Sequence, residues 1–260
     1  MQPRLLLFDI GNTSIKVGIA DAVSVETTYT LRTDAGQTAD SLGLTLLSVL
    51  EHARIAPQSV TACVSSSVVP AMEPLLREAC QRFVGRALLR VPQDIPVPLK
   101  NHYSRPAEVG ADRLVGAFAA RRLFPAPASL VCVDFGTATT FDCITGHAYL
   151  GGLIFPGVFT AARALAAGAA KLPPVSLEVT ADEPAPGRDT ATSINHGIIF
   201  GFACMVEGLT ARLARQLPGP VEILATGGFA PAIARVSTCF DHVLPALLLD
   251  GLRQLYMEHS

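Results

Sequence analysis

The stretch that decides the fold is Leu5–Ala20, which reads LLLFDIGNTSIKVGIA. Its first part, Leu5–Ile10, is a continuous apolar run with a single acid, Asp9. The turn-forming triplet Gly-Asn-Thr follows, and apolar residues then alternate with smaller or polar ones through Ser14–Ala20. A buried run, a glycine turn and an alternating run predict two β-strands joined by a tight turn.

The same pattern returns about half a chain length later. The apolar run Leu130–Val133 leads into Asp134-Phe135-Gly136-Thr137, and a second run, Ala138–Ile144, follows. Two halves that each open with a strand, an Asp-x-Gly turn and another strand predict a duplicated α/β unit. We therefore expect an N-terminal domain over residues 1–113, a C-terminal domain over residues 114–260 and a nucleotide cleft between them.

Further elements follow from periodicity and from turn residues. Strand patterns occur in Cys63–Val69 and in Ile223–Ala225, and the second of these runs into Thr226-Gly227-Gly228. A helix is also expected just after Asp112. The other expected segments are helices over Ser41–Ala53, Ala71–Phe83, Phe159–Ala170 and Thr192–Leu217, and extended or proline-rich connections over Val91–Pro98 and Leu172–Gly187.

Composition limits the kind of function. The chain has 260 residues, 50% of them hydrophobic, and a net charge of −2, so it has the apolar material for a large core and lacks a basic field for nucleic acid. We expect no apolar stretch of the roughly 18 to 20 residues that cross a bilayer, and hence a cytoplasmic protein without a membrane partner. The six cysteines form no CxxC pair, which favours free thiols over a metal site.

The first turn carries residue types suited to a nucleotide. Gly11 lets the backbone approach phosphate oxygens, to which the turn amides and the Thr13 hydroxyl can donate. Lys16 can neutralise phosphate charge, and Asp9 can hold Mg²⁺ directly or through water. The alternative is a β-hairpin with a surface lysine. The candidate ATP-binding residues here are Asp9, Ile10, Gly11, Asn12, Thr13, Ser14, Ile15 and Lys16.

The second turn strengthens this interpretation. An acid at the end of a buried strand is costly to desolvate unless a cation or hydrogen bonds compensate it. Two such acids, Asp9 and Asp134, in matching turns indicate a shared ligand. Thr226-Gly227-Gly228, after a third strand, adds a place where backbone can pack against adenine or ribose.

Together with further blocks, these motifs resemble those of type III pantothenate kinases, within the superfamily of sugar kinases, actin and heat-shock chaperones. The blocks are spread over nearly the whole chain in the family's order. They are Asp9–Lys16, Asn101-His102-Tyr103 with Pro106, Gly110–Arg113, Asp134–Thr140, Gly151–Gly157 and Thr226–Gly228. The resemblance implies an α/β protein of two duplicated actin-like (ribonuclease H-like) domains that phosphorylates pantothenate with ATP to 4′-phosphopantothenate, the first step of coenzyme A biosynthesis.

The resemblance also implies roles for individual residues. Asp9–Lys16 and Thr137 contact ATP, and Asp134 helps to hold a monovalent cation, K⁺ or NH₄⁺, beside the Mg²⁺ that accompanies ATP. Asp112 accepts the proton of the pantothenate hydroxyl. The implied pantothenate contacts are Tyr103, Gly110, Ala111, Asp112, Arg113 and Thr190, with Thr192 and Ser193 as nearby alternatives to Thr190. A homodimer is implied as well, and the apolar segment Phe159–Ala170 suits such an interface.

Several alternatives stay open at this level. Arg113 suits either the pantothenate carboxylate or developing phosphate charge, and Asp112 with Arg113 also suits a local ion pair at a helix start. Asp142 suits either a metal contact or a strand cap. Alternative functions are a kinase or phosphatase for another small substrate, and a non-catalytic, transcription-linked member of the same family.

Overall fold

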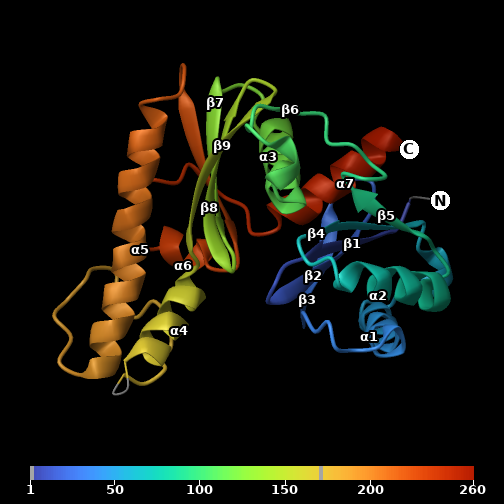
Figure 1. Ribbon diagram of the computed structural model, residues 1–260, viewed down its shortest axis with the longest axis horizontal. Coiled ribbons are helices and arrows are strands. Elements are labelled where there is room, and N and C mark those ends of the chain that lie inside the picture. Colours follow the sequence, from blue (N-terminus) through green and yellow to red (C-terminus); the bar gives the residue numbers. More distant parts are fainter. Residues whose placement is uncertain (1–2, 170–171) are drawn as a thin grey trace. The chain divides into compact units, whose positions relative to one another are not determined.

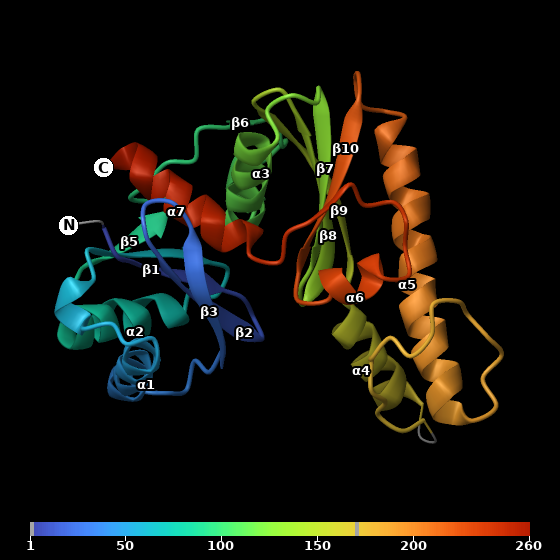
Figure 2. The same ribbon diagram turned by 180° about the vertical axis from the view of Figure 1, so that it is seen from behind.

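The computed structural model describes residues 3–169 and 172–260, which form two compact units (Figures 1 and 2). Unit 1 comprises Met1–Leu99, Arg105–Ala119 and Ala246–Ser260. Unit 2 comprises Lys100–Ser104 and Ala120–Pro245.

Unit 1 is a sheet with helices on both of its faces. Its strands are β1 (Leu5–Ile10), β2 (Ser14–Ala20), β3 (Val25–Arg32), β4 (Ala62–Ser67) and β5 (Leu88–Val91). Its helices are α1 (Ala39–His52), η1 (Pro57–Ser59), α2 (Met72–Ala79), the π-helix η2 (Cys80–Val84), η3 (Pro106–Glu108), the first part of α3 (Ala111–Leu123) and α7 (Leu247–His259).

Unit 2 repeats the same plan. Its strands are β6 (Lys100–Asn101), β7 (Ser129–Phe135), β8 (Ala138–Thr145), β9 (Ala148–Pro156), β10 (Val221–Gly227) and β11 (His242–Val243). Its helices are α4 (Val158–Gly168), α5 (Thr190–Ala214), α6 (Ala230–Ala234) and the end of α3.

The sheet topology confirms the predicted duplication. Over the described residues the first sheet has the order β3-β2-β1-β4-β5, and the second has β9-β8-β7-β10-β11 with β6 added beside β9. In the first sheet β3, β2 and β1 are antiparallel neighbours, and β4 and β5 continue in parallel from β1. In the second sheet β9, β8 and β7 are antiparallel neighbours, and β10 and β11 continue in parallel from β7. The two sheets are therefore two copies of one α/β plan.

Burial in unit 1 follows the alternation of β1. Leu6, Phe8 and Ile10 pack into the core that α1 and α2 cover, whereas Leu5 and Leu7 pack against α7. Figures 1 and 2 show α1 and α2 on one side of this sheet and α7 on the other. A strand buried on both faces explains why Leu5–Ile10 is apolar apart from Asp9 rather than alternating.

The expected elements compare closely with those observed. The first two strands have the predicted bounds, and the expected helix over Ser41–Ala53 spans Ala39–His52. The expected helix over Ala71–Phe83 changes to a π-helix at Cys80, whose carbonyl accepts from the left-handed Gly85 that ends it. The helix expected over Phe159–Ala170 spans Val158–Gly168, and Ala170 itself lies outside the described residues.

The domain boundary expected between residues 113 and 114 differs from the division into compact units. That position lies inside α3, which continues as one helix to Leu123. The C-terminal helix α7 also packs against β1 and β4 of unit 1. The end of the chain therefore belongs to the first unit.

Helix α5 corrects one expectation. Contrary to the predicted absence of any long apolar stretch, Thr190–Ala214 has 25 residues with a hydropathy of 1.5 and is long and apolar enough to cross a membrane. However, Ile199, Phe202 and Val206 pack against β7 and β10 in the core of unit 2. One face of α5 therefore packs in the core of unit 2, and 33% of its apolar stretch is buried.

A first prediction concerns the contribution of α7 to unit 1. Leu252 is fully buried between the strands and α3, so Leu252→Ala should lower the free energy of unfolding by about 2–5 kcal/mol. Met257 on the same helix is 37% exposed, and Met257→Ala should cost less than about 1 kcal/mol. Urea denaturation measures both, and equal losses would contradict the placement of α7.

Candidate active site

The first loop of unit 1 is held by its own backbone and by one threonine. The Gly11 amide donates to the Ser14 carbonyl at 3.0 Å, and the Thr33 hydroxyl donates to the Gly11 carbonyl at 2.7 Å. Asn12 and Thr13 are exposed at the tip. Asp9 pairs with Lys16 across the strands, and Lys16 Nζ lies 3.9 Å from Asp9 Oδ2. A fixed turn thus presents small polar groups, one acid and one lysine.

The Gly110–Arg113 block lies at the same edge of the sheet. The Val68 amide, just after β4, donates to the Ile10 carbonyl at 3.1 Å. A Cβ on Gly110 would lie 3.4 Å from Val68 Cγ1 and 2.4 Å from Asp112 Oδ1. The carboxyl ends of neighbouring parallel strands meet here, which is where ligands bind in open α/β sheets. Within unit 1, the structure therefore brings the first loop and Asp112 to one end of the sheet.

Asp112 has the electrostatic character of a poised base. Desolvation raises the pKa of its carboxyl above the ordinary value of 3.8, and this effect outweighs the Arg113 amide, which donates to Asp112 Oδ1 at 2.8 Å, and the Arg113 charge. A carboxylate with a raised pKa binds a proton more readily than a solvated one. A side chain at position 110 would force the Asp112 carboxylate to shift.

The second loop, in unit 2, is one residue shorter than the first. The Gly136 amide donates to the Ala138 carbonyl at 3.0 Å. Asp134 is the last but one residue of β7, as Asp9 is of β1. Its cross-strand partner is Thr140, whereas Asp9 faces Lys16. The two acids therefore correspond in position, but the second faces a neutral side chain across the strands.

Two glycines allow backbone to press against this second loop. A Cβ on Gly227, which has φ +91°, would lie 2.3 Å from Asp134 Oδ1. A Cβ on Gly157 would lie 2.4 Å from the carbonyls of Gly136 and Thr137. The structure thus brings the Thr226-Gly227-Gly228 motif and the end of the Gly151–Gly157 block to Asp134 and Thr137.

The Thr137 carbonyl ties the second loop to the start of α4. It accepts from the Gly157 amide at 3.1 Å and from the Thr160 hydroxyl at 2.7 Å. Sequence reasoning missed Thr160. The available signal was a hydroxyl in the first turn of an expected helix directly after the glycine block.

Tyr103 lies on the β6 side of unit 2. Its amide donates to Asn101 Oδ1 at 3.0 Å, and its ring lies against Gly151. The ring of Tyr149 lies 6.5 Å from it, centroid to centroid. Sequence reasoning also missed Tyr149. The available signal was a tyrosine hydroxyl in an otherwise apolar strand.

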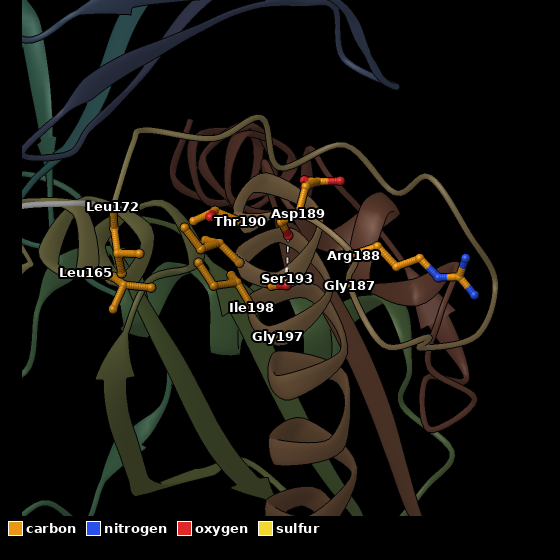
Figure 3. A pocket seen from close by; sticks show the side chains of 10 residues that line it. Leu165, Leu172, Gly187, Arg188, Asp189, Thr190, Ser193, Gly197 and Ile198 are labelled. Carbon is orange, nitrogen blue, oxygen red and sulfur yellow. Dashed lines mark hydrogen bonds between the residues drawn. The ribbon is translucent and has the colours of Figure 1, made fainter.

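Thr190 lies at the start of α5 beside a cavity of about 680 Å³ (Figure 3). Asp189 caps the helix, accepting from the Thr192 amide at 2.8 Å and the Thr192 hydroxyl at 2.9 Å. The Ser193 hydroxyl donates to the Asp189 carbonyl at 2.8 Å. The hydroxyls of Thr192 and Ser193 therefore donate to the capping residue, and Thr190 and Ser193 both line the cavity. Leu165 and Leu172 line the opposite side of the cavity, and Arg188 extends away from it.

Known proteins resemble this chain over nearly its full length. Residues 5–212 match the family model described as type III pantothenate kinase. A relative of that name from Desulfovibrio desulfuricans is 68% identical over 258 residues, which cover 99% of this chain and 98% of the relative.

Solved structures share the fold at low identity. A Baf family transcriptional activator from Campylobacter jejuni superposes with a TM-score of 0.60 at 18% identity, covering 98% of each chain. A ROK hexokinase from Thermus thermophilus superposes with a TM-score of 0.50 at 15% identity, covering 99% of this chain and 100% of the hexokinase. At such identities, these likenesses show the fold alone, and they agree with two duplicated actin-like domains.

A second prediction follows from the raised pKa of Asp112. Because the pKa of Asp112 is raised above 3.8 in the folded protein, stability falls as the pH rises from about 3.8, and the full cost of the ionised carboxylate is present above the folded pKa. Asp112→Asn removes this cost and should raise the Tm at pH 7 by a few degrees. The gain should disappear below about pH 3.8, where the wild-type carboxyl is protonated in both states. Calorimetry across pH measures this, and a lower Tm of the variant at pH 7 would contradict it.

Proposed function

Because the chain belongs to the type III pantothenate kinase family, we propose that it transfers the γ-phosphoryl group of ATP to the primary hydroxyl of pantothenate. The product is 4′-phosphopantothenate, and the reaction is the first step of coenzyme A biosynthesis. The observation that carries this proposal is the match to the family along nearly the whole chain. The placement of Asp112 at the same edge of unit 1 as the first loop supports it.

ATP is held through its phosphates in this proposal. The backbone amides of Gly11–Thr13 and the Thr13 hydroxyl donate to phosphate oxygens, Lys16 neutralises their charge, and Thr137 contacts them from the second loop. Phosphoryl transfer needs alignment and charge neutralisation more than covalent help from the protein. The rigid hydrogen bonding of the first loop suits this task.

Mg²⁺ and a monovalent cation complete the proposed charge balance. Mg²⁺ commonly uses one or two carboxylates together with phosphate oxygens, and Asp9, at the base of the first loop, fits that role directly or through water. Asp134 offers a carboxylate at the second loop, and we assign it the monovalent cation, K⁺ or NH₄⁺. The bound cations would neutralise charge that the phosphates and the two acids share.

Pantothenate is oriented by the remaining blocks. Asp112 accepts the hydroxyl proton as the oxygen attacks the γ-phosphorus, and Arg113 pairs with the pantothenate carboxylate or with developing phosphate charge. Tyr103, Gly110, Ala111 and Thr190 make the other proposed contacts. We place the enzyme in the cytoplasm, where ATP is available as co-substrate.

The proposal predicts ADP release that depends on pantothenate. Asp112→Asn keeps the size and most hydrogen bonds of the side chain but removes the base, so kcat should fall about 10² to 10⁴-fold. The binding of pantothenate, measured by calorimetry, should change little. The wild-type rate should fall as the pH drops through the Asp112 pKa, which lies above the ordinary 3.8.

Asp9→Asn is the matched control for this assay. It should weaken productive engagement of Mg·ATP, and added Mg²⁺ should partly restore the rate, whereas it should not restore Asp112→Asn. Equal ADP release with and without pantothenate would overturn the proposed substrate. Near-normal turnover of Asp112→Asn would remove the residue from the catalytic role.

A monovalent cation should be required for turnover. Asp134 faces Thr140 across the strands, and in this proposal a monovalent cation offsets the repulsion between its carboxylate and the phosphates. Replacing K⁺ with a bulky organic cation at constant ionic strength should lower kcat by at least about tenfold. Asp134→Asn should be slow in either salt. An unchanged wild-type rate would contradict the role of Asp134.

We also propose a homodimer. Phe159 and Leu165 on α4 are 55% and 41% exposed, and α4 borders an apolar cavity of about 510 Å³. Sedimentation at micromolar concentration should show a dimer, and a charged residue in place of Phe159 should shift it towards monomer. Arg122→Glu, an exposed change outside α4, is the control. Fully active monomers would rule the dimer out.

A further inference from the structure

Asp142 is a buried acid to which the proposed reaction assigns no role. It lies on β8 and is 4% exposed. Its Oδ1 accepts from the Tyr149 hydroxyl at 2.8 Å, and its Oδ2 accepts from the Thr140 hydroxyl at 3.3 Å. The side chain of Tyr149 is fully buried. A buried phenol needs a hydrogen-bond partner, and a carboxylate is among the stronger ones. The carboxylate therefore fixes the Tyr149 ring.

A β-bulge in β9 lies next to the buried Tyr149. Cys143 pairs with Gly151, but the next residue, Ile144, pairs with Tyr149, so Leu150 is the extra residue of the bulge. Leu150 is 39% exposed, and Gly151 has φ +103°, which favours glycine. This accounts for the first glycine of the Gly151–Gly157 block.

The strand that carries Tyr149 also holds Tyr103. The Tyr149 carbonyl accepts from the His102 amide at 2.9 Å, and Asn101 pairs with Tyr149 across β6 and β9. The two tyrosine rings lie 6.5 Å apart at 36°. A Cβ on Gly151 would lie 3.1 Å from Tyr103 Cδ2, so the ring rests on the bulge itself. Tyr103 is thus held through its backbone and its ring by Tyr149 and its neighbours.

We infer that Asp142 is a positioning residue for pantothenate, which acts through the Tyr149 hydroxyl and the bulge to hold the ring of Tyr103 in its binding orientation. The inference rests on the proposed role of Tyr103 as a substrate contact. It assigns Asp142 neither a metal nor a strand cap, the two alternatives open from sequence. Small displacements of a substrate contact are costly, because alignment of the bound substrate governs the rate.

Steady-state kinetics of two variants tests the inference. Asp142→Asn removes the charged acceptor, and Tyr149→Phe removes the donor but keeps the ring. Both should raise the KM for pantothenate about tenfold or more, with the KM for ATP within twofold of wild type. The double variant should be no more impaired than the more impaired single variant, because both changes act on the same bond.

Ser129→Ala is the matched control in the same sheet. Ser129 is fully buried, and its hydroxyl bonds Thr145 at 2.9 Å and the Pro218 carbonyl at 2.8 Å. Its loss should lower stability without changing the KM for pantothenate. An equal rise of that KM in Ser129→Ala would mean that any buried hydrogen bond of the sheet has this effect, and would overturn the inference.

Fluorine NMR gives a readout that does not depend on turnover. The chain has four tyrosines, so 3-fluorotyrosine labelling gives four resonances, which single Tyr→Phe variants assign. The Tyr103 resonance should shift in Tyr149→Phe and in Asp142→Asn, whereas Tyr29 and Tyr256 stay unchanged. If Asp142→Asn does not fold, Tyr149→Phe decides alone. An unmoved Tyr103 resonance with an unchanged KM would overturn the inference.

Tyr103→Ala separates this inference from the proposed function. If it raises the KM for pantothenate while Asp142→Asn and Tyr149→Phe do not, Tyr103 binds substrate and the positioning role of Asp142 is wrong. If Tyr103→Ala leaves that KM unchanged, the proposed substrate contact fails, and with it a role of Asp142 in pantothenate binding. Wild-type turnover of pantothenate is the direct test of the function itself.

Discussion

The hydrogen-bonded position of the central strand is the constraint on which each unit depends. β1 lies between β2 and β4, and β7 lies between β8 and β10, so each central strand is antiparallel to one neighbour and parallel to the other. The antiparallel neighbour requires a tight turn at the carboxyl end, and the parallel neighbour ends at that same edge. The glycine turn, the acid before it and the end of another strand therefore lie together in both units.

Close backbone packing around the second loop is the next consequence. Gly227 and Gly157 stand where any side chain would collide with Asp134 Oδ1 or with the loop carbonyls. The Thr137 carbonyl is in turn held by the first turn of α4. Glycine at these two positions therefore permits close contact between backbones as well as chain flexibility. This contact lets motifs that are separate in sequence lie next to one another in the fold.

The parts of the fold that could be predicted are those set by local chemistry. The bounds of β1 and β2 follow from an apolar run, a glycine turn and alternation, all within 16 residues. The packing of α7 against β1 could not be predicted, because it joins segments from opposite ends of the chain. The bulge in β9 could not be predicted from the sequence either, because an extra residue is defined only by the pairing with a partner strand.

Much the same division holds for the candidate site. The acids and glycines of both loops could be identified from residue types in a repeated pattern. Thr160 and Tyr149 gave only weak local signals, because their partners, the Thr137 carbonyl and Asp142, are defined by the fold. Asp112 shows why such sites stand out physically. Burial raises the pKa of its carboxyl, so the ionised form destabilises the fold that carries it. A structure optimised for stability alone would place a neutral residue there, and a buried acid at this position agrees with the base role proposed for Asp112.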